Sequence, residues 1–301
     1  MIDVLLAVYN GEAYLKQQLD SVLNQKCSVP FHVLVSDDGS TDGTADILKS
    51  YGEKITLVPN LYEKGAKNNF LSLLKQCEAP YAAFCDQDDI WEENKLQTVY
   101  DAMIEGEDSK PCLVHTDLSV IDAEGKAVYD SLFAHQGWDK DAVTLNRLLV
   151  QNNATGCTML LNRPLIDLVN GQNAQKIVMH DWWTALTAAA FGKIICLGNK
   201  TVRYRQHDKN VIGASRKTMM ERAFAALTMG KKMKKRIAIT YNQAEEFLAC
   251  YGNRLTKEKS ACLRFYIRIQ NQNKLERIAN LHRGAYNMQN RIQRIGHMWF
   301  A

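Results

Sequence analysis

The stretch Tyr81-Ala-Ala-Phe-Cys-Asp-Gln-Asp-Asp-Ile-Trp91 determines how the rest of this chain is interpreted. Its apolar and aromatic residues at 81–85 predict a short strand. The strand ends abruptly in three acids, Asp86, Asp88 and Asp89. Such a concentration of negative charge is costly unless a cation or a hydrogen-bond network compensates it. One Asp is enough to cap a following helix. Three acids within four positions therefore favour a metal site.

The residues after the acids have helical spacing. Apolar side chains recur from Trp91 through Leu96 and Val99 to Met103, which places the acids in a predicted strand-to-helix turn. In an open α/β sheet such turns lie at the carboxyl edge, where ligands bind.

Strand and helix patterns alternate before and after this turn. Strands are predicted at residues 4–8, 31–35, 55–58, 81–85 and 113–121. Helical patterns with short connections separate them, and this alternation predicts an α/β fold with a parallel sheet. The first strand is followed by neither a Gly-x-Gly-x-x-Gly fingerprint nor a P-loop. Instead, Asp37 and Asp38 follow the second strand, so two carboxylate clusters are expected to face one crevice.

The second half of the chain is less regular. We expect a loop at residues 126–155, strands at 156–161 and 193–197, and an Ala-rich helix that His180-Asp181-Trp182-Trp183 opens. Asp181 is either the N-cap of that helix or a functional acid. The two Trp residues either stack on a sugar or pack in the core. A polar, Arg-rich segment at 202–213 contains His207, and a lone His is usually structural.

Charge is distributed unevenly along the 301 residues. The net charge is +4, but residues 1–215 carry 19 basic and 28 acidic side chains, whereas residues 216–301 carry 18 and 5, a balance of +13. We therefore expect two domains, 1–215 and 216–301. The second region has helical patterns throughout and a basic run at 231–236. Such helices suit an anionic membrane surface, with a nucleic-acid footprint or simple packing on the main domain as alternatives.

Cysteine usage and hydropathy indicate the compartment. The eight Cys are scattered without a Cys-x-x-Cys pair, which favours a reducing environment. The amino-terminal residues have the pattern of a first strand and not of a signal peptide. No apolar run approaches the roughly 20 residues of a membrane span. A cytoplasmic protein, peripheral on the inner face of a bacterial membrane, is the expectation.

Taken together and in order, the motifs at Tyr9-Asn10-Gly11, Asp37–Asp42 and Asp86–Trp91 resemble those of glycosyltransferase family 2. Members of this family have the GT-A fold and move a sugar from a nucleotide diphosphate. The resemblance covers residues 1–215 and is closest to bacterial rhamnosyltransferase-type enzymes of cell-wall and capsular polysaccharide synthesis. It implies a Rossmann-like, mostly parallel sheet flanked by helices, with a C-terminal helical extension.

The same resemblance implies roles for individual residues. Asp88 is the metal ligand, Asp86 faces the ribose or a metal-bound water, and His207 adds a second metal ligand. Asp181 is the catalytic base, in a His-Asp pair where the family usually carries Glu-Asp. Donor-binding residues are implied at Ala7, Tyr9, Asn10, Asp37, Asp38, Gly65, Asn69, Asp86, Gln87 and Arg205. Acceptor-binding residues are implied at Trp182, Trp183 and Asp89, with helix capping as the alternative for Asp89.

The implied activity is an inverting, non-processive sugar transfer that uses Mg²⁺ or Mn²⁺. The donor is a dTDP- or UDP-sugar, with dTDP-L-rhamnose favoured, and the acceptor is a lipid-linked or growing glycan. A sugar nucleotidyltransferase is the enzymatic rival, but it needs a basic Gly-rich loop after the first strand. A non-catalytic glycan-binding protein is the second rival. No nucleic-acid partner is expected, and homo-oligomerisation is left open.

Overall fold

The computed structural model of the protein describes residues 1–106, 109–172, 174–207 and 219–300, with backbone only for 219–229 and 292. These residues form two compact units. The first comprises residues 1–133, 154–171 and 179–206, and the second comprises 134–153, 172–178 and 207–301. The predicted domain boundary at 215/216 falls among residues 208–218, outside the described residues. The two short segments that join the C-terminal region were not expected.

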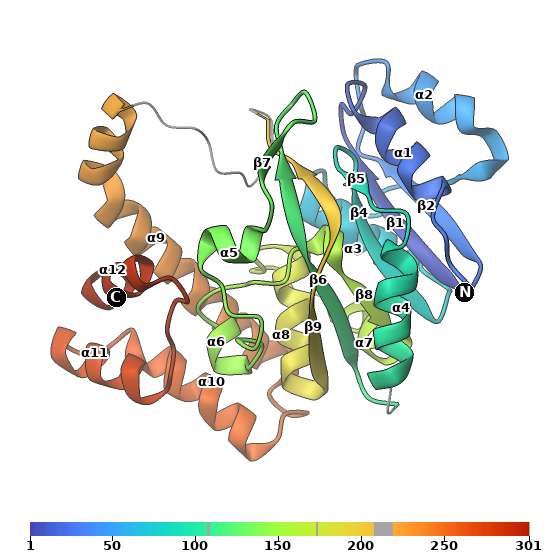
Figure 1. The fold of residues 1–301 in the computed structure, drawn as a ribbon. Helices are drawn as coiled ribbons and strands as arrows, with labels where there is room; N and C mark the ends of the chain where they lie inside the picture. The colour runs from blue at the N-terminus through green and yellow to red at the C-terminus, as the bar shows by residue number, and fades with distance from the viewer. Residues whose placement is uncertain (107–108, 173, 208–218, 301) are drawn as a thin grey trace. The chain divides into compact units, whose positions relative to one another are not determined.

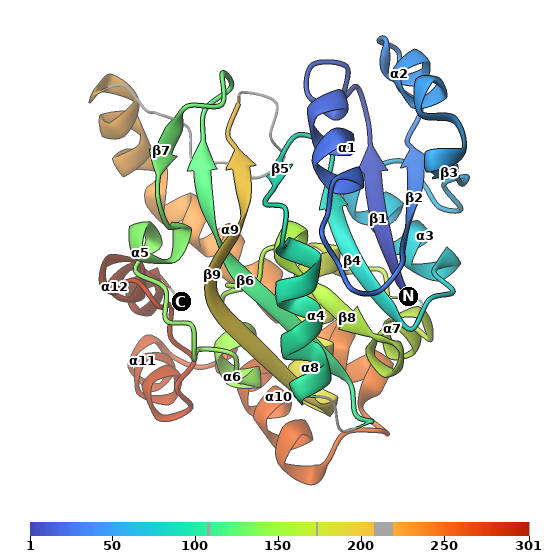
Figure 2. The same cartoon turned by 45° about the vertical axis from the view of Figure 1, so that its right-hand side comes forward.

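The first unit is built on one sheet with the strand order β3-β2-β1-β4-β8-β6-β9-β5, and β7 pairs with β6 (Figures 1 and 2). The strands are β1 (Ile2–Val8), β2 (Phe31–Asp37), β3 (Thr56–Leu57), β4 (Tyr81–Asp86), β5 (Ile90–Trp91), β6 (Cys112–Ile121), β7 (Ala127–Tyr129), β8 (Leu160–Asn162) and β9 (Lys193–Arg205).

The sheet is mixed: its long ladders are parallel, β6 with β9 among them, and short antiparallel ladders complete it, which agrees with the expected mostly parallel sheet. β1 pairs in parallel with β2 and β4, and β2 with β3, as the strand–helix alternation predicts. Beyond β4 the short β8 is antiparallel to both of its neighbours, β4 and β6. The regular alternation of strand and helix ends at β6, so the pattern gave no direction for the later strands.

Helices cover both faces of the sheet in the first unit. They are α1 (Leu15–Leu23), α2 (Thr44–Tyr51), α3 (Ala66–Gln76), α4 (Lys95–Gly106), α7 (Arg163–Asn170) and α8 (His180–Phe191), with short 3₁₀ turns at Gly52–Lys54 and Gly156–Thr158. The segment Leu132–Gln136 forms α5, which spans the boundary of the two units.

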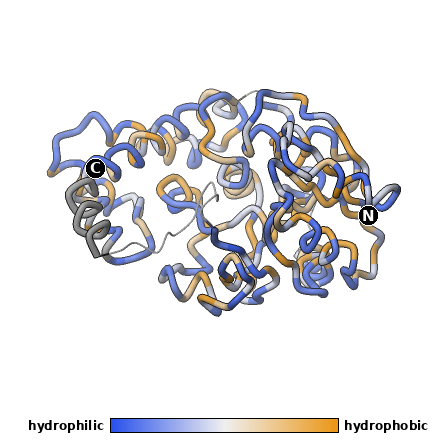
Figure 3. Tube along the Cα trace, turned by 90° about the horizontal axis from the view of Figure 1, so that it is seen from above, coloured by the Kyte–Doolittle hydropathy of each residue, from blue (hydrophilic) through white to orange (hydrophobic). Residues whose placement is uncertain are grey.

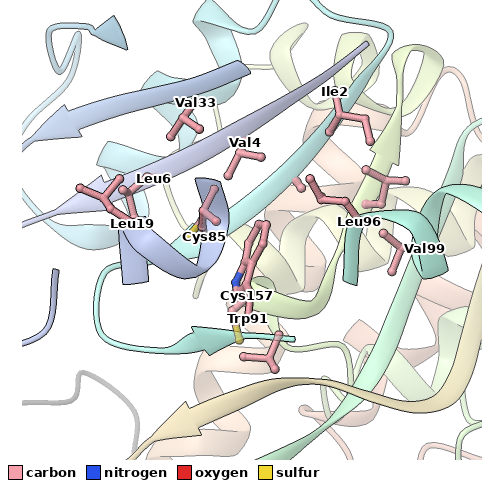
Figure 4. Packing of buried hydrophobic residues seen from close by; sticks show 14 of the residues in the cluster. Ile2, Val4, Leu6, Leu19, Val33, Cys85, Trp91, Leu96, Val99 and Cys157 are labelled. Atoms are coloured by element: carbon pink, nitrogen blue, oxygen red, sulfur yellow. The ribbon is translucent and has the colours of Figure 1, made fainter. Parts of the chain in front are cut away.

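The alternation of side chains along β1 and β4 explains this layering. Val4, Leu6 and Cys85 pack with residues of α1 and α4 in the main core cluster (Figure 4). On the opposite face, the ring of Phe84 contacts Phe70 of α3 and His180 of α8. Because both faces are buried, the apolar runs in β1 and β4 are continuous and do not alternate with polar residues.

The second unit is helical, which confirms the expectation for the described part of the C-terminal region. It contains α6 (Leu145–Leu148), α9 (Met219–Tyr251), α10 (Lys257–Ile269), α11 (Lys274–Arg283) and α12 (Arg291–Phe300). Its interior includes three neighbouring Tyr rings, Tyr241, Tyr266 and Tyr286. Hydrophobic and hydrophilic positions alternate along the chain trace (Figure 3). None of the described helices is both long and apolar enough to cross a membrane.

Three elements differ from the predictions made by pattern. The strand β5 separates the acids from α4, so the turn after β4 does not lead directly into a helix. β9 continues to Arg205, beyond the expected strand at 193–197, and includes the first part of the polar segment that begins at residue 202. The expected loop at 126–155 contains β7, α5 and α6. In each of these regions the local sequence pattern is weak, and contacts with distant parts of the chain determine the secondary structure.

Gly192 connects α8 to β9 and has no space for a side chain. A Cβ at this position would lie 1.7 Å from the carbonyl oxygen of Pro111, which accepts a hydrogen bond from the amide of Lys193. We expect Gly192→Ala to lower the free energy of unfolding by at least about 1–3 kcal/mol, because the clash involves rigid backbone. Urea denaturation monitored by circular dichroism measures this change.

Gly198, inside β9, is the matched control. Among the described residues, no atom lies within 4 Å of the Cβ position at Gly198. Gly198→Ala should change the free energy of unfolding by less than about 0.5 kcal/mol. Equal effects of the two substitutions would contradict the packing argument.

Candidate active site at the carboxyl edge of the sheet

The strand register brings the two predicted carboxylate clusters to the same edge. Val8, the last residue of β1, pairs with Asp37 of β2, and Ala7 pairs with Asp86 of β4. Asp37 and Asp86 therefore lie on either side of the end of β1. In Figure 2 the arrowheads of the three strands lie side by side. The sequence predicted this arrangement, because both carboxylate clusters were expected to face one crevice.

Hydrogen bonds connect the loop after β1 to the loops after its two neighbours. The side-chain amide of Gln87 accepts from the amide of Tyr9 at 2.7 Å and donates to the carbonyl of Tyr9 at 2.9 Å. Asn10, which has a positive φ of 48°, donates its backbone amide to Ser40 and accepts from the amide of Thr41. The three predicted residues Tyr9, Asn10 and Gln87 thus shape this edge before any ligand is bound.

Asp37 and Asp38 are both engaged in loop contacts. Asp37 Oδ1 accepts from the amide and the hydroxyl of Ser40. Asp38 is buried, and its carboxylate accepts from the side chain of Asn60 and from the amide of Gly65. This second contact fixes the start of α3, where Gly65 has a φ of 125° that favours glycine.

Asn69 is also buried, and it donates to the carbonyl of Ser36 at 2.9 Å. These contacts tie α3 to the end of β2. The donor-binding roles of Asp37, Asp38, Gly65 and Asn69, and that of the half-buried Ala7, stay predictions.

The acids at the end of β4 repel one another. Burial, followed by repulsion from Asp89, Asp88 and Asp181, raises the pKa of Asp86 well above its ordinary range. Burial and repulsion from Asp88 raise the pKa of Asp89 to about 8. Both shifts mean that the site without a cation resists full ionisation. A divalent cation would relieve that repulsion directly.

Sequence reasoning missed Lys95, a second buried charge near this site. Lys95 is fully buried, and its ammonium lies 3.4 Å from the centroid of the Trp91 ring. Within the described residues its Nζ has no hydrogen-bond partner. Burial lowers the pKa of Lys95 to about 8, while Asp89 is among the groups that favour its charged form. A signal existed, because Lys95 shares the buried face of α4 with Val99 and Met103 at helical spacing.

Arg205, the last residue of β9, holds the acidic loop in place. Its guanidinium donates to the carbonyl of Asp88 at 2.9 Å, to the carbonyl of Ala123 at 2.9 Å and to the side chain of Gln17 at 2.7 Å. Its backbone amide donates to Asp89 Oδ1 at 3.0 Å. The side chain predicted to bind the donor is therefore buried among protein acceptors, and its role in binding the donor stays a prediction.

The donor set fits a hard divalent cation. Ligand atoms of Asp86, Asp89 and Cys157 all lie within 4.8 Å of one another. Across the described ranges, Asp89 Oδ2 is buried without a hydrogen-bond partner. Burial keeps the pKa of Cys157 well above its usual value, so its thiol stays protonated and the carboxylates are the available ligands.

Two assigned metal ligands stay predictions. The half-buried Asp88 lies beside this set. His207 belongs to the second unit, and its role as a metal ligand stays a prediction.

Asp181 lies in the first turn of α8. The helix begins at His180 with Met179 as its N-cap, so the alternative that Asp181 is the N-cap is wrong. Its carboxylate accepts from the amide of Trp182 at 2.6 Å. Burial raises the pKa of Asp181 to about 6, although backbone hydrogen bonds partly oppose the shift. Asp181 also contributes to the repulsion that raises the pKa of Asp86, so the two carboxylates lie close enough for their charges to interact.

The neighbouring His180 is an aromatic core residue. Its ring stacks on Phe70 with centroids 3.9 Å apart and meets the edge of Phe84 at 4.7 Å. Burial lowers the pKa of His180 to about 3, so the ring is neutral. The position that usually carries Glu in the family is here used for packing.

The predicted acceptor-binding residues are largely buried. Trp183 is 1% exposed and Trp182 is 8% exposed, which favours core packing over sugar stacking for both rings. Asp89 is fully buried. It also precedes the start of α4 by six residues, so the alternative that it caps this helix is wrong. Contact between these three residues and an acceptor stays a prediction.

We expect Arg205→Lys to displace the acidic loop. A single ammonium does not reproduce the forked set of bonds to the Asp88 carbonyl, Ala123 and Gln17. The free energy of unfolding should fall by about 1.5–3 kcal/mol, because buried carbonyl groups lose a charged donor. Isothermal titration of Mn²⁺ should show at least a tenfold loss of affinity at the same time.

Arg203→Lys is the matched control on the same strand. Arg203 is half exposed and forms a surface ion pair with Glu92. Surface pairs of this kind contribute little, so both measured quantities should stay within error of the wild type. A similar loss in both variants would show that the effect is not specific to the Arg205 contacts, whereas an unchanged Arg205→Lys would show that Arg205 acts through its charge alone.

Comparison with known proteins relates this edge to one family. The sequence profile described as glycosyl transferase family 2 matches residues 3–163. The dTDP-rhamnosyl transferase RfbG of Shigella flexneri is 31% identical over 225 residues, which cover 70% of this chain and 74% of RfbG. The UDP-Glc:alpha-D-GlcNAc-diphosphoundecaprenol beta-1,3-glucosyltransferase WfgD of Escherichia coli is 28% identical over 198 residues, 65% of this chain and 74% of WfgD.

Solved structures show the same fold. S. aureus TarS 1-349 in complex with UDP-GlcNAc has a TM-score of 0.60 at 18% identity, covering 94% of this chain and 80% of that chain. The mannosyltransferase PcManGT from Pyrobaculum calidifontis, in complex with GDP-Man and Mn²⁺, has a TM-score of 0.52 at 14% identity, covering 99% and 87%. At these identities the likeness concerns the fold alone, and it confirms the predicted GT-A fold.

Proposed function

Because the chain belongs to glycosyl transferase family 2, we propose that this glycosyltransferase is inverting, non-processive and dependent on a divalent cation. The proposed donor is dTDP-L-rhamnose, and the proposed acceptor is a lipid-linked or growing cell-wall or capsular glycan. The similarity to RfbG supports the choice of donor. The similarity to WfgD supports a UDP-hexose as the second candidate.

The observation that carries the proposal is the meeting of two acidic groups at one sheet edge. Asp86 ends β4, and Asp181 lies in the first turn of α8, the helix whose His180 packs against Phe84 of that strand. Phe84 and Asp86 are two residues apart and so point to the same face of β4. The strand and the helix therefore present one carboxylate each to the same face of the sheet.

These two groups suit the two halves of a displacement reaction. Departure of a nucleoside diphosphate leaves negative charge, and a cation held by Asp88 with Asp86 or Asp89 would supply the positive charge that offsets it. Asp181 would take the proton from the acceptor hydroxyl as that oxygen attacks the sugar carbon. A general base of this kind contributes about 10² to 10⁴ in rate. Direct displacement inverts the anomeric configuration.

The loop after β1 would receive the nucleoside. The Tyr9 ring is 53% exposed at this edge, although its backbone is fixed by Gln87. An aromatic face of this kind suits stacking on a base. Two further proposed donor contacts, Asn10 and Asp38, lie on the connected loops that follow β1 and β2.

Asp88→Ala should abolish cation-dependent donor binding. The variant loses the carboxylate proposed to hold the cation, so Mn²⁺ should no longer increase the affinity for dTDP or UDP. Calorimetric titration of the nucleotide with and without Mn²⁺ measures this. Asp130→Ala removes an exposed acid that pairs with Lys200 at the surface and serves as the control. Unchanged Mn²⁺-dependent binding in Asp88→Ala would exclude the metal assignment.

Activity should rise with pH through about 6. Asp181 is a base only when ionised, and burial raises its pKa to about 6, so transfer should weaken as the pH falls below that value. A cation bound at the neighbouring acids would lower this pKa and move the rise in activity to lower pH. The pH profile of kcat/KM with a panel of dTDP- and UDP-sugars and a lipid-linked acceptor measures the effect. Asp181→Asn should lose at least about 10² in kcat while it retains donor binding, and a flat profile would argue against Asp181 as the base.

A further inference from the structure

We infer that α11 and α12 carry an apolar anchor that inserts into an anionic phospholipid surface. We define the anchor patch as Leu275, Ile295 and Trp299. This inference rests on the proposed lipid-linked acceptor and names the part of the protein that would meet the membrane. All of its residues belong to the second unit.

The anchor patch consists of the most exposed large hydrophobic side chains among the described residues. Leu275 is 81% exposed, Ile295 is 70% exposed and Trp299 is 62% exposed, the three highest values among exposed large hydrophobic side chains. Single exposed apolar residues are common on soluble proteins. A group of three with such exposure indicates an interaction site.

The three residues are held near one another by local geometry. Ile295 and Trp299 are one turn apart on α12 and so share a face of that helix. The ammonium of Lys274, at the start of α11, lies 3.6 Å from the centroid of the Trp299 ring. Leu275 follows Lys274 directly, so the amino end of α11 lies beside the carboxyl end of α12.

Packing on α9 fixes which face of α12 points outward. His297 is 1% exposed, so the face opposite Ile295 and Trp299 is buried. A Cβ at Gly296 would lie 3.4 Å from the terminal methyl of Met233, and one at Gly230 would lie 2.9 Å from the Phe300 ring. These close approaches hold α12 against α9, with Ile295 and Trp299 facing away.

Charge identifies the kind of surface that fits. Met233, which contacts α12, is flanked in α9 by four exposed lysines, Lys231, Lys232, Lys234 and Lys235. Residues 230–300 contain 15 Lys or Arg against 4 Asp or Glu. Basic side chains around exposed Trp, Ile and Leu match a membrane interface, where the apolar groups enter the acyl boundary and the cations meet anionic headgroups. Nucleic acid would satisfy the charge but not the apolar side chains.

Vesicle binding by the full-length protein tests the inference. Wild-type protein should co-sediment with vesicles of phosphatidylglycerol and phosphatidylcholine, should bind less with rising NaCl, and should not bind phosphatidylcholine alone. Ile295→Gln/Trp299→Gln should reduce binding roughly tenfold or more, because two insertable side chains are lost. The emission of Trp299 should shift to the blue with vesicles, and this shift should disappear in Trp299→Phe.

The matched control is Leu57→Gln/Ile104→Gln, which removes two exposed apolar side chains from the first unit. It should bind vesicles like the wild type. All variants should keep nucleotide binding in solution, so a loss of vesicle binding alone is separable from failure of the proposed activity. The inference is overturned if the wild type does not bind anionic vesicles or if the anchor variant binds normally. It is equally overturned if the protein prefers DNA, or if the anchor variant instead abolishes a dimer seen by light scattering.

Discussion

The rest of the structure depends on uncompensated negative charge at the end of β4. Four carboxylates, those of Asp86, Asp88, Asp89 and Asp181, influence one another within a buried or half-buried edge. Two buried cations, Arg205 and Lys95, lie close to the acids and partly offset this repulsion. Arg205 holds the loop through its carbonyl groups, and Lys95 lies over Trp91 inside the core. Despite these cations the acids still repel one another, so the edge keeps a negative field that favours a divalent cation.

Strand pairing and core packing position this negative charge. Parallel pairing around β1 brings the ends of β2 and β4 to one level, and residues buried on both faces make the strands rigid. Loops that carry the polar residues then connect to one another, through Gln87 with Tyr9 and through Asp38 with Gly65. A fixed scaffold with functional loops at the carboxyl edge is the arrangement that α/β sheets share. In this protein the loops are cross-linked by side-chain amides and carboxylates before any ligand arrives.

Sequence reasoning recovered the parts that local pattern encodes. The strands β1, β2 and β4, the meeting of Asp37 with Asp86 and the helical C-terminal region follow from period and residue type. The position of β8 between β4 and β6 was not predictable, because a three-residue strand carries no information about its partners. The helix-capping alternatives for Asp89 and Asp181 were wrong, because helix starts are set by tertiary pairing within a few residues. Lys95 was overlooked because lysine is rarely buried, although its spacing with Val99 placed it on the inner face of α4.

The stacking of His180 between α3 and β4 has a consequence for how this enzyme changes over time. The imidazole is wedged against Phe70 and Phe84, and the next residue in the chain is the proposed base. The packing of the core therefore sets the orientation of the Asp181 carboxylate, which lies in a helix and not in a loop. Selection on catalysis and selection on folding act here on the same rings. Substitutions at Phe70 or Phe84 are therefore constrained both by the packing of the core and by the placement of Asp181.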